Sequence, residues 1–185
     1  MTTPIEETLI AWIEADPERK DALRVASQLQ LNDWCLAAGF VRNLVWDRLH
    51  GYSEPTPLDD IDLIYFDSTD ITERRDRLLE SRLHGMLARR WSVKNQARMH
   101  AQNGDAPYHS MADAMTYWVE LETAVGVRLI GEETGVLEII APLGLESLFN
   151  LNVTMNPKRK KPEAFADRVQ GKGWKKKWPN LVIEK

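Results

Sequence analysis

Two aspartates separated by one residue, Asp60 and Asp62, are the side chains of this sequence most suited to chemistry. They open a run to Phe66 that is rich in β-branched and aromatic residues, which predicts a strand. Alternate side chains of a strand share a face, so both carboxylates point the same way and repel each other. A divalent cation relieves that repulsion, and Mg²⁺ is usually held by one or two carboxylates plus substrate phosphates. The pattern therefore predicts phosphoryl or nucleotidyl transfer, with Asp60 and Asp62 as catalytic residues and metal ligands.

A glycine turn and a predicted helix precede this strand. The turn reads Gly39-Phe-Val-Arg42-Asn43. This order of turn, helix and Asp-x-Asp strand resembles the signature of the DNA polymerase beta-like nucleotidyltransferase superfamily, and the turn is similar to the Gly-Gly-x-Val-Arg-Asp motif of tRNA CCA-adding enzymes and poly(A) polymerases. The whole chain resembles a small bacterial group of nucleotidyltransferase-like proteins, and that likeness also covers the segments 91–100, 141–145 and 175–181.

The resemblance implies a fold, a reaction and a set of site residues. The fold is α/β or α+β, a short mixed sheet of the nucleotidyltransferase type with helices packed on it. One or two Mg²⁺ ions on Asp60 and Asp62 assist transfer of a nucleoside monophosphate from a nucleoside triphosphate to an acceptor hydroxyl, whose identity stays unknown. The implied nucleotide-binding residues are Gly39, Arg42, Asn43 and Asn95.

Arg42 stands near the start of the predicted helix, where the helix dipole favours anions. In that position its guanidinium would steady the triphosphate. The alternative is a surface salt bridge to Asp47 or Asp59.

The turn departs from the motif at two positions. Phe40 takes the place of the second glycine, and Asn43 takes the place of the final acid. A phenylalanine beside a phosphate-binding turn would limit how closely a triphosphate approaches the backbone, because glycine permits such contact. Phe40 favours a second hypothesis, a catalytically reduced nucleotide-binding or interaction protein that retains the fold, and so does the missing third acid described next.

The superfamily normally supplies a third carboxylate from a later strand, yet the segment 91–96 contains no acid. Asn95 stands near the expected position, and three glutamates in or beside later predicted strands can substitute: Glu120, Glu122 and Glu138. A third acid close to Asp60 and Asp62 would favour the enzyme, whereas Lys94 closing the site would favour the reduced protein.

Polar side chains are dense at the end of the strand predicted over 91–95. They either line a nucleotide pocket or form a solvated transition from strand to loop. The residues concerned are Lys94, Asn95, Gln96, Arg98 and His100.

Length and composition predict one compact domain, because 185 residues with 43% apolar content suffice for a core. No segment approaches the length of a membrane-spanning helix, and the N-terminus carries Glu6, Glu7 and Glu14 where a secretory signal needs a basic start and an apolar run. We therefore expect a cytoplasmic protein with no membrane partner. The single cysteine, Cys35, excludes an intramolecular disulfide and is expected to be buried.

Charge is unevenly distributed along the chain. Residues 156–185 carry ten Lys and Arg against three Asp and Glu, a net charge of +7, so residues 1–155 carry −11 within the total of −4. We expect a nucleotidyltransferase-like domain over 1–155 and a basic C-terminal segment over 156–185 packed on it. So acidic a body does not suit wide nucleic-acid binding, which makes nucleic acid a less favoured partner.

Trp174 and Trp178 flank a run of three lysines in the C-terminal segment. Single-stranded nucleic-acid binders use such a pattern for base stacking, so RNA binding through this segment is a third hypothesis. Because the two residues are four apart, they also share one face of a helix and can pin the segment to the body. The pinning role is favoured.

Capping signals and hydrophobic periodicity divide the chain into alternating elements. A cap residue followed by proline predicts two N-terminal helices, over 3–15 and 16–29. The elements expected next are a strand over 34–38, a helix over 41–49, the strand over 60–66 and a helix that begins near Asp70. The second half is expected to hold a strand over 91–95, a helix over 110–118, a hairpin of strands over 125–130 and 136–140, and a short helix near Leu145.

Overall fold

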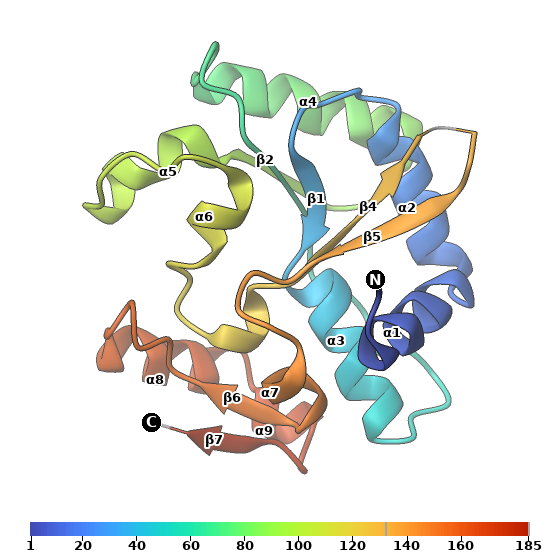
Figure 1. Cartoon of the computed structure of the whole chain (residues 1–185), viewed down its shortest axis with the longest axis vertical. Coiled ribbons are helices and arrows are strands. Elements are labelled where there is room, and N and C mark those ends of the chain that lie inside the picture. The colour runs from blue at the N-terminus through green and yellow to red at the C-terminus, as the bar shows by residue number, and fades with distance from the viewer. Residues whose placement is uncertain (132, 185) are drawn as a thin grey trace.

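A computed structural model describes residues 1–131 and 133–184 and shows helices packed around a mixed sheet (Figure 1). The main sheet has the strand order β3-β2-β1-β4-β5. Its strands are β1 (Trp34–Ala37), β2 (Ile61–Tyr65), β3 (Trp91–Asn95), β4 (Gly126–Ile130) and β5 (Val136–Ile140). The predicted fold class, a short mixed sheet with packed helices, is confirmed.

Register in the sheet decides which side chains meet beside Asp62. Strands β2 and β3 run parallel and pair Asp62 with Ser92 and Ile64 with Lys94. Strand β1 runs antiparallel to β2 and places Ala37 opposite Asp62. Residues in register share a face, so these side chains lie on one face of the sheet and their sequence neighbours lie on the other.

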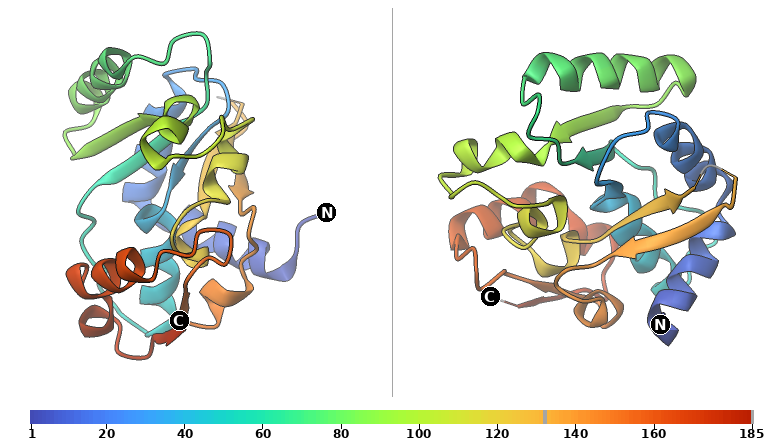
Figure 2. Two further views of the ribbon diagram at one scale, coloured as in Figure 1. Left: turned by 90° about the vertical axis from the view of Figure 1, so that its left-hand side faces the viewer. Right: turned by 45° about the horizontal axis from the view of Figure 1, so that its top comes forward.

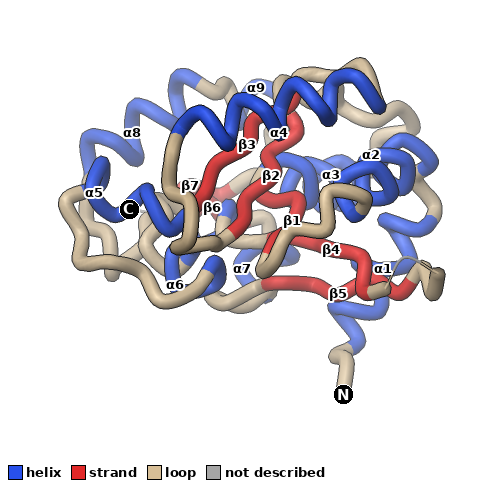
Figure 3. The backbone as a smooth tube through the Cα atoms, turned by 90° about the horizontal axis from the view of Figure 1, so that it is seen from above, coloured by secondary structure: helices blue, strands red, loops and turns tan. Residues whose placement is uncertain are grey.

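The face opposite Asp62 is covered by the helices α2 (Pro17–Ser27), α3 (Gly39–Leu49) and α4 (Glu73–Met86), which lie on the same side of the strands in Figure 3. Leu36, Leu63 and Val93 bury their side chains in the core between these helices and the sheet. Helix α1 (Pro4–Glu14) packs beside α2 and begins with the predicted capping box of Thr3 and Glu6.

Two helix starts differ from the sequence predictions. Helix α3 begins at Gly39, two residues early, because Ala38 already provides the change in backbone direction. Helix α4 is capped by Thr72, whose side chain accepts from Arg75 N. Asp70 instead accepts hydrogen bonds from the N–H and hydroxyl of Thr72, so it shapes the turn before the cap.

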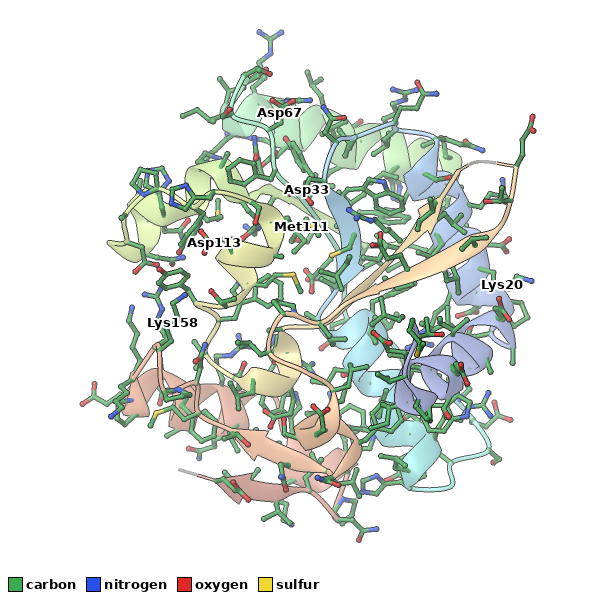
Figure 4. All side chains as sticks on the ribbon, in the orientation of Figure 1. Lys20, Asp33, Asp67, Met111, Asp113 and Lys158 are labelled. Carbon is green, nitrogen blue, oxygen red and sulfur yellow. The ribbon has the colours of Figure 1, made fainter. Side chains whose placement is uncertain are left out.

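The face that carries Asp62 is covered by α5 (Gln96–Asn103) and α6 (Met111–Met115). Helix α5 was not predicted from the sequence, and α6 is shorter than the predicted helix over 110–118. Met111 N donates to Asp33 Oδ2 at 2.8 Å, which fixes the start of α6 beside the residue before β1 (Figure 4). Cys35, Ala37 and Ile64 pack against α6, so Cys35 is the buried residue expected.

The predicted hairpin is present as β4 and β5, and Figure 2 shows it reaching the N-terminal helices. Glu132, in its predicted turn, lies outside the described residues, as does Lys185 of the basic segment. The chain then forms the elements η1 (Leu121–Thr123, before β4), α7 (Glu146–Phe149), β6 (Asn152–Thr154), α8 (Pro162–Gly171), α9 (Trp174–Lys177) and β7 (Val182–Glu184). Strands β6 and β7 pair in parallel as a second, two-stranded sheet below α3 in Figure 1.

Two tryptophans attach this C-terminal part to α3. Trp174 and Trp178 are 2% and 1% exposed, and both rings pack edge-on against Trp46, with centroids 5.6 and 5.0 Å away. Trp178 Nε1 also donates to Asp47 Oδ1 at 2.8 Å. Their favoured role as packing residues is therefore confirmed.

Among residues 1–131 and 133–184, no helix combines the length and the apolar content needed to cross a membrane.

Candidate active site

Asp60 and Asp62 lie at the beginning of β2. Asp62 is the second residue of the strand and is half-buried, whereas Asp60 is exposed just before it. Asp60 Oδ1 lies 3.3 Å from Arg90 Nε in an exposed, and therefore weak, ion pair. Burial raises the pKa of Asp62, the charge of Asp60 raises it further, and the charges of Arg42 and Lys172 oppose the rise. The two carboxylates thus lie close enough to repel each other.

No third acid joins this pair among the residues that the structure describes. Glu120 is 1% exposed and is paired with Arg168. Glu122 accepts a hydrogen bond from a backbone N–H of β6, and Glu138 pairs with Arg128 across the hairpin. Each of the three glutamates is held by a structural partner, so any metal set available here consists of two carboxylates.

The carboxylate of Asp62 has no hydrogen bond or ion pair with any described residue, although it is half-buried. A charged group withdrawn from water without a partner is unfavourable, and a cation would offset that cost. Two carboxylates on neighbouring positions suit Mg²⁺, whose remaining ligands are water and substrate phosphates. Asp60 and Asp62 therefore fit a divalent cation.

The turn before α3 has an uncommon backbone conformation. Ala38 has φ 58° and ψ −125°, a region that residues with a side chain rarely adopt. A Cβ on Gly39 would meet Arg42 Nη2 and Asn43 Nδ2 at 3.3 Å. Phe40 is helical and 1% exposed, with its ring in the core, so the prediction that it crowds an approaching triphosphate is wrong. Ala38, not Phe40, is the position of the turn where the backbone conformation would suit glycine.

Arg42 is buried, at 6% exposure, and its guanidinium is surrounded by partners. Nη1 donates to Thr123 Oγ1 at 2.9 Å, and Nε and Nη2 donate to Asn43 Oδ1 at 3.2 and 3.1 Å. The guanidinium also lies over the rings of Trp46 and Trp174, 5.1 and 4.7 Å from their centroids. Burial lowers the pKa of Arg42 to about 10, although the charge of a nearby glutamate opposes the change.

The alternative expected for Arg42, a surface salt bridge to Asp47 or Asp59, is wrong because the side chain is buried. Its two bonds to Asn43 Oδ1 fix the orientation of that carboxamide. Asn43 Nδ2 has no hydrogen bond with the described residues, and Asn43 lines the hollow described next. Arg42 therefore orients an N–H donor.

A hollow of about 240 Å³ separates the start of α3 from the C-terminal segment. Its acidic side consists of Asp59, Asp60 and Asp62, and its basic side consists of residues in or just after α8 and in α9: Arg168, Lys172 and Lys177. We call it the cationic hollow. An 11-residue helix begins at its wall, so the helix dipole and the three cations together favour an anion there.

A second hollow, of about 330 Å³, lies on the face of the sheet covered by α5 and α6. It shares Ala38, Asp62 and Arg168 with the cationic hollow. Its apolar wall includes Tyr117 and Trp118, and we call it the aromatic hollow. Because both hollows border Asp62, a ligand that spans them passes directly over this carboxylate.

Only part of the polar run after β3 reaches the site. Lys94 and Gln96 line the aromatic hollow. Asn95 is 0% exposed and pairs with Tyr65 in the sheet, so it faces away from Asp62. Its Nδ2 donates to two backbone carbonyls of the loop after β2, at 2.7 and 3.0 Å, and its Oδ1 caps α5. This structural role removes Asn95 from the nucleotide-binding set; Arg98 pairs with Asp76 and also lies outside the two hollows.

The sequence reading assigned no site role to three residues that the structure places there: Arg168, Lys172 and Lys177. Arg168 lies on α8 and Lys172 is the C-cap of that helix four residues later, a spacing that puts both on one helix face. That spacing was a usable signal. The sequence did not show that this helix face lies opposite Asp60 and Asp62.

Comparisons with known proteins identify the family and the fold. The profile of a protein family described as Nucleotidyltransferase matches residues 24–183. A solved structure described as revealing a CCA-adding enzyme head domain shares 33% sequence identity with the chain, at a TM-score of 0.83, over 96% of this chain and 94% of that one. A search of curated proteins gave no match.

A second solved structure, of a CCA-adding enzyme in complex with CTP, is similar in fold only, with 14% identity and a TM-score of 0.54. The alignment covers 100% of this chain and 44% of that enzyme. The resemblance inferred from the glycine turn and the Asp-x-Asp strand is confirmed. The chain belongs to the nucleotidyltransferase family.

Proposed function

We propose that this protein transfers a nucleoside monophosphate from a nucleoside triphosphate to an acceptor hydroxyl, with a divalent cation, Mg²⁺, held by Asp60 and Asp62. The observation that carries the proposal is the half-buried, unpartnered carboxylate of Asp62 at the meeting point of the two hollows. The fold of the chain is shared with a CCA-adding enzyme that was solved with CTP, which supports a nucleoside triphosphate as donor.

The cationic hollow suits the triphosphate. Lys172 and Lys177 are exposed side chains with positive charge, and neither has an ion-pair partner among the described residues. The first turn of α3 adds backbone N–H groups, and Asn43 adds a side-chain N–H whose direction Arg42 fixes. These groups bind and orient the phosphate chain and stabilise the charge that develops on the leaving pyrophosphate.

The metal fits the two carboxylates on three grounds: they are adjacent, Asp62 lacks a partner, and two such ligands leave room for substrate phosphates. When bound, Mg²⁺ would neutralise charge on the transferring phosphoryl group. Asp62 lies on a strand that is paired on both sides, and Asp60 directly precedes that strand, so the backbone that carries the two carboxylates is preorganised.

The aromatic hollow suits the rest of the reacting assembly. The acceptor hydroxyl attacks the α-phosphorus roughly in line with the departing pyrophosphate. With pyrophosphate in the cationic hollow, the acceptor must therefore approach from the other side of Asp62. The aromatic hollow opens there, and Tyr117 and Trp118 give it apolar surface for a ring system. We assign the nucleoside and the acceptor hydroxyl to this side.

RNA binding through stacking on the C-terminal tryptophans receives no support. Trp174 and Trp178 are buried against Trp46, so their faces are not available to bases. Nucleic acid therefore stays a less favoured partner.

The test is calorimetric titration of each of the four ribonucleoside triphosphates in the presence and absence of Mg²⁺. Wild type should bind in a metal-dependent manner, and the Asp60→Asn/Asp62→Asn double variant should lose the metal dependence while it keeps the fold. Absence of binding by folded wild-type protein would reject the function and leave an interaction protein that retains the fold.

A further inference from the structure

Arg168 occupies a special position between the two hollows. It is one of three residues that line both, and it is the only cation among those three described residues, Ala38, Asp62 and Arg168. Its side chain comes from α8, in the C-terminal segment, and is 35% exposed. A ligand that extends from one hollow into the other therefore passes between a carboxylate of β2 and a guanidinium of α8.

The guanidinium of Arg168 is fixed on one edge. Its Nε donates to Glu120 Oε1, and its plane lies over the ring of Trp174, 5.8 Å from the centroid. Glu120 is itself held, because its Oε2 accepts a hydrogen bond from Thr123 Oγ1 at 3.0 Å. Thr123 Oγ1 in turn accepts from Arg42 Nη1. This chain of contacts sets the position of Arg168 from the body of the protein.

The other edge of the guanidinium is free. Nη1 and Nη2 of Arg168 have no hydrogen-bond partner among residues 1–131 and 133–184. A planar guanidinium with free terminal nitrogens is suited to bidentate binding of phosphate oxygens. Arg42 differs in this respect, because it is buried and both of its terminal nitrogens donate inside the protein.

One phosphate of the donor must occupy the junction of the hollows. The α-phosphate is bonded both to the pyrophosphate, which belongs in the cationic hollow, and to the nucleoside, which belongs in the aromatic hollow. We propose that Arg168 binds the α-phosphate and that Glu120 is the positioning residue that presents its free edge. The assignment rests on the proposed function and extends it to the C-terminal segment, where no phosphate ligand was expected from the sequence.

The test compares two ligands that differ in the part that should reach Arg168. A nucleoside triphosphate carries the α-phosphate and nucleoside, whereas pyrophosphate occupies the cationic hollow alone. Affinities for both are measured by calorimetry in Mg²⁺ for wild type, Arg168→Gln and Lys172→Gln. Lys172, the C-cap of α8, stands one helical turn after Arg168 and lines only the cationic hollow of the two, which makes it the matched comparison.

Arg168→Gln should weaken nucleoside triphosphate binding about tenfold more than it weakens pyrophosphate binding, because Arg168 lines both hollows and only the triphosphate places its α-phosphate between them. Lys172→Gln should weaken both ligands by similar factors. Glu120→Gln should likewise weaken the triphosphate more than pyrophosphate, as expected if Glu120 acts through Arg168. Arg128→Gln removes a similar arginine–glutamate pair in the hairpin and should change neither affinity.

Arg168→Gln leaves the buried Glu120 carboxylate without its cation, so the Arg168→Gln/Glu120→Gln double variant guards against loss of the fold. Equal losses for both ligands in folded Arg168→Gln, or no loss for either, overturn the assignment. A wild-type protein that binds the triphosphate no more tightly than pyrophosphate also overturns it. If folded wild type binds neither ligand, the proposed function itself fails.

Discussion

Arg42 and Asn43 are sequence neighbours on α3 whose side chains are joined by two hydrogen bonds, from Arg42 Nε and Nη2 to the same oxygen, Asn43 Oδ1. A buried cation thereby receives a neutral acceptor, and a site residue receives a fixed orientation. The pair couples the stability of the protein to the geometry of the cationic hollow.

Asn43→Ala is expected to lower the free energy of unfolding by about 2–4 kcal/mol, because the buried guanidinium loses both acceptor bonds. Asn43→Asp should keep wild-type stability or exceed it, since a carboxylate accepts the same two bonds with charge assistance. Urea denaturation of the three proteins measures the difference. An Asn43→Ala variant that unfolds at the wild-type midpoint would show that Arg42 does not depend on this acceptor.

Ala38→Gly should stabilise the protein by about 1 kcal/mol, because glycine adopts φ 58° without the strain that a Cβ introduces. Ala37→Gly is the matched control, one residue earlier in the regular strand β1, and should destabilise. Thermal unfolding of both variants decides the matter. If Ala38→Gly destabilises as much as Ala37→Gly does, the turn is not strained in solution.

Trp178→Phe removes the hydrogen bond from Nε1 to Asp47 while it keeps most of the ring packing against Trp46. The buried Asp47 loses one of its donors, so we expect a loss of about 1–3 kcal/mol in unfolding free energy. Trp12→Phe, which alters a ring stacked on Phe149 away from the site, serves as the comparison. Pyrophosphate affinity should fall only in Trp178→Phe, because Trp178 lines the cationic hollow next to Lys177, whereas Trp12 does not.

The raised pKa of Asp62 predicts a stability that depends on pH. The folded state binds the Asp62 proton more tightly than the unfolded chain does, so stability falls as pH rises through the interval between the two pKa values. In metal-free buffer, Asp62→Asn should therefore be more stable than wild type at neutral pH, and the gap should close in acid below the pKa of the unfolded chain.

Addition of Mg²⁺ with a nucleoside triphosphate should reverse that order, because only wild type gains binding energy. Melting temperatures measured across acidic and neutral buffers test both statements. The variant Asp21→Asn, on the exposed surface of α2, should follow wild type at every pH. If the melting temperatures of wild type and Asp62→Asn are equal at every pH, the pKa of Asp62 is not raised in the folded protein.

The sequence predicted the parts of this molecule that local rules determine. Thr3 and Asp16 cap their helices as expected, and the alternation of β2 placed Asp62 on the face opposite Leu63. Helix α5 was missed because Asn95 was interpreted as a site residue, although asparagine is also a good helix cap. Asn95 is a site residue if its side chain lies on the same face of β3 as the site, and a helix cap if it lies on the other face. Which face it takes depends on how β3 pairs with the rest of the sheet.

The cationic hollow shows where local rules end. Arg42 was expected to bind the triphosphate because its neighbourhood shows only Trp46, four residues later on α3, and does not reveal Trp174, the second ring that covers its guanidinium. Trp178, which lines the hollow, is 131 positions away in the chain from Asp47, to which its Nε1 donates. Contacts between residues so far apart in the sequence depend on the packing of the whole fold. The basic C-terminal segment could therefore be recognised by its charge, but its position beside the cationic hollow could not be predicted.

The attachment of the C-terminal segment to α3 has a consequence for protein synthesis. Asp60 and Asp62 leave the ribosome before Arg168, Lys172 and Lys177, which follow them much later in the sequence. A nascent chain therefore carries the acidic half of the cationic hollow before it carries the basic half. Under the proposed function, a nascent chain becomes able to bind a nucleotide only once it has been synthesised through Lys177.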